Sequence, residues 1–315
     1  MSLEKERKLE LEERWQAVCD PLPGCIPYLN RRPCRIKAHE GGLRFIEMLE
    51  NRFPGKLSEE EWRQVFVRKE VVKKSTGEAV LDPDLRVVTG HQYVRLLPDW
   101  TEPAVGTDLR VIAEDEVLLV VDKPAPLPMH EGGRFYKNTL MYLMGQAWPE
   151  LEARYTHRLD AETSGVLVCV KGDRCRSVVQ KSFEAGLVSK WYLARVKGHP
   201  DWEEKRVERT VPAEGRRWGK PLEACTDLRV LERAIDGTSL VEARPLTGRT
   251  HQIRVHLWQE GYPLVGDRLY LEDGQLGEVE IAGLGAQDLA LRSWRIEFPH
   301  PSSGQLVQFE GERRL

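Results

Sequence analysis

The sequence predicts an α+β protein in which a small α/β domain precedes a larger domain with a mixed, mainly antiparallel sheet. Three observations predict this class. Apolar runs of strand length alternate with helical segments over residues 111–315, without a regular strand–helix–strand repeat. Two short helical patterns and several strand-like segments occupy residues 41–98. Between them, residues 99–110 are polar and contain proline and glycine, which predicts a linker.

The composition is that of a globular protein. Of its 315 residues, 41% are hydrophobic and 31% charged, and the net charge of −3 counts against a nucleic-acid binder without excluding a local basic groove. Basic residues cluster over 31–37 and 216–220, and either cluster could instead be a solvated face. No apolar run has the length of a membrane span, and the charged N-terminus shows no signal-peptide core. We therefore expect a cytoplasmic protein that does not bind membranes.

Residues 1–40 are expected to form an N-terminal extension. A charged, weakly amphipathic helix is predicted over residues 3–18, and residues 20–36, rich in proline and arginine, predict an irregular connector. Three cysteines lie near His39 and could bind zinc together with it: Cys19, Cys25 and Cys34. Their spacing lacks the short intervals typical of structural zinc sites, so we expect reduced, packed cysteines and no metal.

The small domain begins with helical spacing of apolar residues from Leu43. Ser58, followed three residues later by Glu61, predicts the capped start of a second helix. Strand-like segments follow, at residues 78–81, 86–88 and 93–97. This order resembles the RNA-binding domain named after ribosomal small-subunit protein four. Its usual basic turn is present as Arg68 and Lys69, but Glu70 replaces the glycine normally found there, and a generic packing domain is the alternative interpretation.

The large domain shows its elements in order along the chain. Apolar runs and alternation predict strands, at residues 117–121, 166–170, 191–196, 228–231, 239–244, 296–298 and 307–310. Helical spacing predicts three helices, at residues 139–148, 174–185 and 251–260. Gly261 ends the last of these helices.

The strongest signal for chemistry is the run from His157 to Gly165, HRLDAETSG, which leads into a buried strand. It predicts a polar loop on a rigid sheet that presents one carboxylate, Asp160, beside the cation Arg158. Thr163 and its neighbouring serine can hold the loop through backbone hydrogen bonds. An isolated turn of this kind could be purely structural.

The whole run resembles the His-Arg-Leu-Asp-x-x-Thr-Ser-Gly signature of the RluA-type pseudouridine synthase family. The resemblance implies that Asp160 is the essential catalytic residue. It also implies that Arg158 helps to eject the target base and holds its phosphate. His157 and Thr163, which belong to the same signature, are expected to contact the RNA.

Two further blocks resemble the same family. The block SKWYLA (189–194) is similar to its Lys-x-Tyr-x-Ala strand, which implies that Tyr192 packs on the uracil and Lys190 contacts substrate; a core-facing aromatic is the alternative. The block LTGRTHQIRVHL (246–257) implies that Arg254 lies against the catalytic carboxylate and that Leu257 walls the pocket. Such an arginine would keep Asp160 ionised despite burial. Arg249 is expected to contact RNA, and a role in stabilising the turn is the alternative.

The resemblance implies an RNA pseudouridine synthase that needs no cofactor. We expect ribosomal RNA as the substrate, with transfer RNA second, and a monomer without an obligate protein partner. Two other classes of protein remain as alternatives. A binding protein could have kept the fold without the activity, and a nucleosidase would need a second carboxylate, for which Glu162 is the near candidate.

Overall fold

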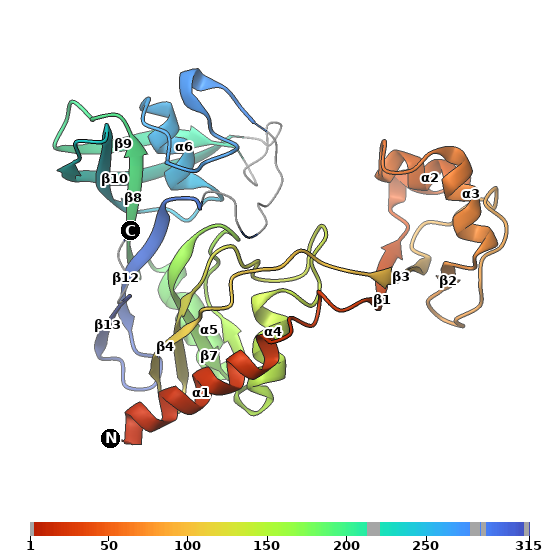
Figure 1. The fold of residues 1–315 in the computed structure, drawn as a ribbon, viewed down its shortest axis with the longest axis horizontal. Coiled ribbons are helices and arrows are strands. Elements are labelled where there is room, and N and C mark those ends of the chain that lie inside the picture. The colour runs from red at the N-terminus through yellow and green to blue at the C-terminus, as the bar shows by residue number, and fades with distance from the viewer. Residues whose placement is uncertain (1–2, 213–220, 278–283, 285–287, 312–314) are drawn as a thin grey trace. The chain divides into compact units, whose positions relative to one another are not determined.

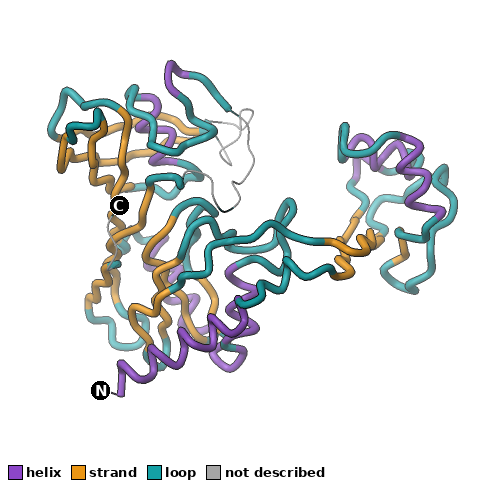
Figure 2. The backbone as a smooth tube through the Cα atoms, viewed as in Figure 1, coloured by secondary structure: helices purple, strands orange, loops and turns teal. Residues whose placement is uncertain are grey.

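A computed structural model of the chain describes residues 3–212, 221–277, 284, 288–311 and 315. The chain divides into two compact units, of which the larger combines Met1–Cys25 with Glu102–Leu315 and the smaller is Ile26–Thr101. Figure 1 labels the elements of both units, and Figure 2 shows how helices, strands and loops are distributed along the backbone. The basic cluster at 216–220 lies outside the described residues.

Most helices and strands belong to the larger unit. Its α-helices are α1 (Leu3–Cys19), α4 (Leu140–Ala147), α5 (Asp173–Glu184) and α6 (Gln252–Gln259). Its strands are β4 (Arg110–Glu114), β5 (Leu118–Lys123), β6 (Ala153–Tyr155), β7 (Ser164–Lys171), β8 (Ser189–Lys197), β9 (Glu204–Val211), β10 (Leu222–Arg233), β11 (Thr238–Pro245), β12 (Leu291–Pro299) and β13 (Leu306–Glu310). Short 3-10 turns occur at Pro149–Leu151 and Glu272–Gly274.

These strands form one ten-stranded sheet with the order β4-β5-β7-β12-β8-β11-β10-β9, to which β13 and β6 add at β12 and β7. Within it, β7 and β12 pair in parallel, and the other strand pairs are antiparallel. The predicted mixed, mainly antiparallel sheet is therefore confirmed. Strand β9 was missed, because only two of its eight residues are buried and its sequence shows no apolar alternation.

Helices α1 and α4 contribute to the main core together with β5, β7 and β8, whereas α5 packs on β7 and β12 through a second cluster. Helix α6 contacts β9, β10 and β11. Thr139 caps α4 with its side chain, which accepts a hydrogen bond from the Tyr142 amide. This arrangement places the starts of β7 and α6 near the middle of the unit, where the candidate site lies.

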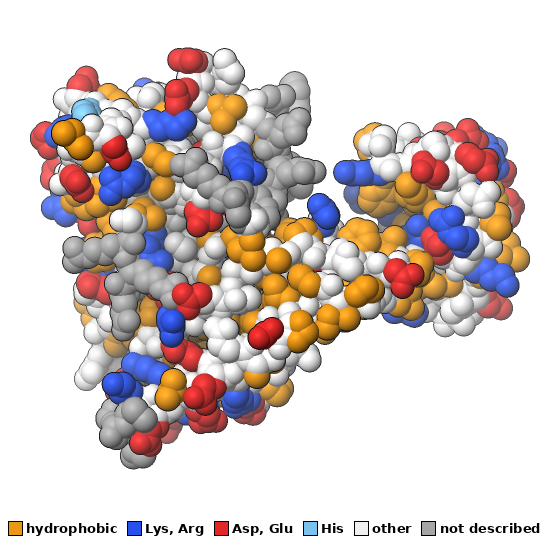
Figure 3. Space-filling model, in the orientation of Figure 1, with side chains coloured by type: hydrophobic (Ala, Val, Ile, Leu, Met, Phe, Trp, Pro, Cys, Tyr) orange, Lys and Arg blue, Asp and Glu red, His pale blue; other side chains and the backbone are white. Residues whose placement is uncertain are grey.

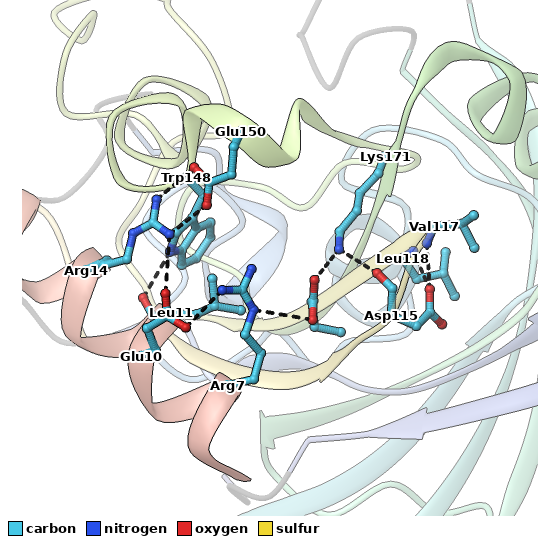
Figure 4. A network of polar contacts seen from close by, with 11 residues as sticks. Arg7, Glu10, Leu11, Arg14, Asp115, Val117, Leu118, Trp148, Glu150 and Lys171 are labelled. Atoms are coloured by element: carbon cyan, nitrogen blue, oxygen red, sulfur yellow. Dashed lines mark hydrogen bonds and ion pairs between the residues drawn. The ribbon is translucent and has the colours of Figure 1, made fainter. Parts of the chain in front are cut away.

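Helix α1 is an integral part of the larger unit (Figure 4). Its Leu11 and Trp15 are fully buried, and the Trp15 ring lies 5.6 Å from that of Trp148. The Trp148 indole donates to the Leu11 carbonyl at 3.0 Å, and Arg14 binds Glu150 through two hydrogen bonds of 2.6 and 2.8 Å. The unit boundary therefore falls after residue 25 and not at the expected residue 40, because this helix is held by its tryptophan and arginine contacts.

The smaller unit has two helices, α2 (Phe45–Arg52) and α3 (Glu59–Val67), and a sheet of order β1-β3-β2. The strands are β1 (Tyr28–Arg35), β2 (Val71–Lys73) and β3 (Gln92–Trp100). The predicted cap of α3 is confirmed, since the Ser58 hydroxyl accepts from the Glu61 amide and the Glu61 carboxylate accepts from the Ser58 amide.

Several predicted boundaries in the smaller unit were wrong. Strand β1 lies in the predicted connector, and it was missed because only Asn30 and Cys34 of its eight residues face the interior. The segments 78–81 and 86–88 make only isolated bridges. Strand β3 continues into the predicted linker, which moves the second boundary to residue 101.

The candidate zinc ligands are divided between the two units. Cys19 is buried in the core of the larger unit, where burial raises its thiol pKa to about 12, and Cys34 is buried in the core of the smaller unit. The described residues contain no group of three or more metal-ligating side chains. Among the helices that the structure describes, none is long and apolar enough to cross a membrane. On the face shown in Figure 3, acidic and basic side chains are interspersed, in keeping with the net charge of −3.

Candidate active site

A cleft of about 530 Å³ opens in the larger unit, and most of the residues that line it come from three parts of the chain. These are the turn over residues 156–163 that precedes β7, the start of β8, and the segment 245–254 that enters α6. All but one of the predicted site residues line it: Asp160, Arg254, Tyr192, Arg158, His157, Thr163, Lys190 and Arg249 do, and Leu257 does not. Residues nearly 100 positions apart in the sequence therefore meet in one cavity.

The Asp160 turn is fixed by backbone contacts. The Thr163 amide donates to the Asp160 carbonyl at 3.1 Å, and the Leu127 amide donates to the Ala161 carbonyl at 2.8 Å. Fully buried Lys123 donates from its ammonium to the same Ala161 carbonyl at 3.2 Å. Burial lowers the Lys123 pKa to about 7, while the negative charges of Asp160 and Asp122 oppose that shift. The turn is thus held from the end of β5, and the Asp160 side chain keeps 31% exposure to the cleft.

The end of the turn requires glycine. Gly165 has φ +111°, and a Cβ there would lie 1.9 Å from the carbonyl oxygen of Ser293 on β12. Arg292, beside Ser293, binds Asp122 in a buried ion pair and donates to the Ser164 hydroxyl at 3.3 Å. Strand β12 therefore packs directly against the base of the turn and fixes where Asp160 emerges.

Arg254 lies beside Asp160 but is held by another carboxylate. Its Nε and Nη2 donate to the two oxygens of Asp267 at 2.8 Å each, and its Nη1 lies 4.0 Å from Asp160 Oδ2. Burial opposes the charge on Arg254, yet the hydrogen bonds and charge of Asp267, with Asp160 and Glu162, raise its pKa. The resemblance implied an arginine against Asp160, but the sequence did not predict Asp267 as the group that orients this arginine.

His251 is a third group at the carboxylate. It precedes α6 with φ +55°, a left-handed conformation that is uncommon for a residue with a side chain. Its Nε2 lies 3.9 Å from Asp160 Oδ2, and its Nδ1 lies 3.1 Å from the Tyr270 hydroxyl. Desolvation lowers its pKa, against the negative charge of Asp160, so that the ring is neutral near neutral pH.

Tyr192 forms an aromatic wall of the cleft. It is 8% exposed, and on β8 it lies opposite Ser293 of β12 and Ala243 of β11. Burial raises its pKa, with the nearby charge of Asp160 adding to the effect, and the hydroxyl stays protonated. Lys190, two residues earlier, also lines the cleft, and its ammonium lies 5.6 Å from the centre of the Phe183 ring. A ring and a cation are thus presented side by side.

The remaining predicted contacts divide into exposed and structural groups. Arg158 and Arg249 are exposed at the cleft. His157 instead accepts a hydrogen bond from the Val168 amide at 3.3 Å, and burial lowers its pKa to about 3, so it serves the fold as a neutral ring. Thr163 is also buried.

Leu257 was placed wrongly. It is fully buried in the main core and does not line the cleft, whereas Ile253, one helical turn earlier on α6, does. The reason is helical geometry: the cleft touches only the first turn of α6, and the next turn lies below it in the core. Gln252 sets the start of the helix. Its side-chain amide donates hydrogen bonds to the Cys225 carbonyl and the Thr226 hydroxyl of β10.

The comparisons with known proteins show the family to which the chain belongs. The sequence model described as RNA pseudouridylate synthase matches residues 117–259. A ribosomal large subunit pseudouridine synthase D of Zymomonas mobilis is 31% identical over 268 residues, covering 76% of this chain and 81% of the relative. A dual-specificity RNA pseudouridine synthase RluA of Salmonella typhimurium is 31% identical, covering 64% of this chain and 92% of the relative.

Among solved structures, human RNA pseudouridylate synthase domain containing 1 has a TM-score of 0.52 and 26% identity, and the match covers 65% of this chain and 84% of that one. The fold and these similarities thus define an RNA pseudouridine synthase, an isomerase. The chain belongs to the RluA-type family of these enzymes.

Proposed function

We propose that this enzyme converts specific uridines of structured RNA to pseudouridine, with ribosomal RNA the first candidate substrate and transfer RNA the second, and that Asp160 is the essential residue. The observation that carries the proposal is the position of Asp160: its half-exposed carboxylate opens into the cleft beside Arg254 and His251, with Tyr192 as the facing aromatic wall. The name of the Zymomonas mobilis relative supports ribosomal RNA.

The reaction is an isomerisation, and its balance requires one well-placed carboxylate. The bond between uracil N1 and ribose C1′ breaks, the base turns, and a bond forms between C5 and C1′; the C5 proton is lost and N1 gains one. Asp160 can attack C1′ directly, or it can take the 2′ proton to give a glycal-like intermediate. Both routes place one carboxylate oxygen under the sugar, and neither consumes a cofactor.

The target base must first leave its stack, which costs a few kcal/mol. Tyr192 offers the flipped uracil a stacking surface, which is worth about 1–3 kcal/mol. Exposed Arg158 and Arg249, with Lys190, are positioned to bind phosphates around the cleft. These contacts would offset the cost of extracting the base.

The smaller unit is proposed to bind RNA as well. Its basic turn places Lys69 in a left-handed conformation (φ +59°), while Glu70 is buried and paired with Arg68 and Arg95 at 2.6 and 2.7 Å. If Lys69 contacts a phosphate, Lys69→Gln lowers the slope of log affinity against log salt by roughly 0.7–0.9. Lys56→Gln, an exposed control of the same unit, leaves the slope unchanged; equal slopes for both variants would exclude this contact.

The function is tested by incubating the protein with ribosomal and transfer RNA that carry 5-tritiated uridine. Release of tritium and a pseudouridine at a defined position support the proposal. RNA binding without release would favour a binding protein, and release of uracil from free uridine would favour a nucleosidase. Mapping pseudouridines in cells that lack the gene then identifies the target. We also propose that the protein is a monomer. We further propose a cytoplasmic location, and the six free cysteines support this location.

A further inference from the structure

Two side chains, Tyr270 and His251, link the interior of the larger unit to Asp160. Tyr270 contacts His251, with 3.1 Å between its hydroxyl and Nδ1, and the two rings meet edge-to-face at 89°. On its other side, the His251 Nε2 lies 3.9 Å from Asp160 Oδ2. His251 has a left-handed backbone conformation, with φ +55°. Such backbone outliers persist where the surrounding structure fixes them, and they cluster at functional sites.

The hydroxyl of Tyr270 determines which nitrogen of His251 carries the proton. Tyr270 is 4% exposed, and burial raises its pKa to about 12, so its hydroxyl is protonated. Among the described residues, Nδ1 of His251 is the hydrogen-bond partner of this hydroxyl. A buried hydroxyl hydrogen without an acceptor is costly. The hydroxyl therefore donates to Nδ1, and the proton of the neutral imidazole resides on Nε2.

We propose that Tyr270 fixes the Nε2–H tautomer of His251, and that His251 and Arg254 together hold Asp160 Oδ2, which leaves Oδ1 as the oxygen that acts on the ribose. The proposal rests on the proposed function of Asp160. Tyr270 and His251 are then positioning residues of the reaction.

The geometry of the carboxylate supports this assignment. Oδ2 is the carboxylate oxygen nearest to both His251 Nε2 and Arg254 Nη1, at 3.9 and 4.0 Å, so both donors lie on the same side of the Asp160 carboxylate. Distances of this length in a free enzyme commonly shorten when substrate binds. The opposite tautomer would direct a nitrogen lone pair at the carboxylate, which is repulsive.

The charged groups around His251 are consistent with a neutral ring. Asp160 faces it from the turn before β7, Arg254 from α6, and Asp267 from the loop that leads to Tyr270. Asp267 is already bound to Arg254 through both oxygens. The imidazole is therefore surrounded by one cation, Arg254, and two carboxylates, Asp160 and Asp267, and desolvation keeps it unprotonated.

The first test is nitrogen NMR of histidine-labelled protein at pH 7.5, with the His251 signals assigned from the spectrum of His251→Gln. We expect the Nε2–H tautomer in the unaltered protein and a substantial Nδ1–H population in Tyr270→Phe. Tyr262→Phe, which removes a hydroxyl from a tyrosine outside the cleft, should leave the signals unchanged. An Nδ1–H or doubly protonated His251 in the unaltered protein would overturn the proposal, as would an unchanged tautomer in Tyr270→Phe.

The second test is single-turnover pseudouridine formation with saturating enzyme. Loss of one orienting hydrogen bond predicts a rate about three- to tenfold lower for Tyr270→Phe, with RNA affinity unchanged. His251→Gln, which can place an amide donor near the position of Nε2, should retain more activity than His251→Asn, which cannot reach it. A Tyr270→Phe rate equal to that of Tyr262→Phe, or equal loss in both His251 variants, would contradict the proposal. The NMR result does not depend on activity, so failure of the proposed function remains distinguishable.

Discussion

Replacing Asp267 with asparagine removes the charge that orients Arg254 while keeping the shape of the side chain. Asp267 is fully buried, Arg254 keeps 5% exposure, and the two share a pair of 2.8 Å hydrogen bonds. Asp267 also accepts hydrogen bonds from the Leu269 and Tyr270 amides. The substitution therefore leaves a buried guanidinium without its counter-charge.

The magnitude follows from burial. Removing one partner of a buried ion pair costs about 3–5 kcal/mol, and asparagine keeps one oxygen acceptor, so we expect about 3 kcal/mol for Asp267→Asn. For a domain of this size that corresponds to a fall in Tm of roughly 6–12 °C. Because Arg254 loses its orientation toward Asp160, pseudouridine formation should also fall at a temperature where the variant is folded.

The matched control is Asp227→Asn. Asp227 pairs with Arg206 through two hydrogen bonds of 2.6 and 3.0 Å, but the pair is exposed. Surface pairs of this kind contribute about 0–1 kcal/mol. The assay is thermal unfolding of both variants, followed by single-turnover kinetics. Equal shifts in Tm for the two variants would refute the argument that burial makes the Arg254 pair strong.

Three further predictions concern the turn and the wall of the cleft. Gly165→Ala should destabilise the protein and lower activity, because its Cβ would collide with the Ser293 carbonyl; a variant with unchanged Tm would contradict this packing. The neutral, half-buried ring of His157 gives a prediction for stability against pH. Stability should not depend on this group above pH 6.5 and should fall by up to about 1.4 kcal/mol per pH unit below it, since its pKa drops from 6.5 to about 3 on folding. Denaturant unfolding from pH 7.5 to 5 should show a shallower fall for His157→Gln than for the unaltered protein. Tyr192→Phe keeps the stacking ring and should bind RNA normally, whereas Tyr192→Leu should weaken binding by about 1–3 kcal/mol; equal affinities would argue against stacking.

The sequence was informative where function depends on contiguous residues. The run from His157 to Gly165 contains the turn, its carboxylate and its glycine within nine positions. In the structure, Asp160 emerges from this turn, and Gly165 packs against the Ser293 carbonyl, where a Cβ would collide. Strands with continuous apolar runs, such as β5 and β7, were equally visible because both faces of these strands are buried. Local pattern and local structure coincide at these positions.

The sequence was less informative where a role depends on distant partners. Asp267 and Tyr270 act through Arg254 and His251, 13 and 19 positions away, and no local pattern marks such pairs. The left-handed conformation of His251 could not be predicted, because the residues that usually mark such positions, glycine and asparagine, do not occur there. Helix α1 was recognised as a helix, but its docking depends on a few buried residues within a charged sequence, Leu11, Trp15 and Cys19. These features arise from tertiary contacts and not from periodicity.

The central claim is that Asp160 carries out the isomerisation, and tritium release from RNA containing 5-tritiated uridine tests it most directly. The unaltered protein should release tritium in step with pseudouridine formation. Asp160→Asn should release none above background while binding the same RNA with similar affinity, and Asp201→Asn, an exposed control in the same unit, should behave like the unaltered protein. Full tritium release by Asp160→Asn would contradict the account.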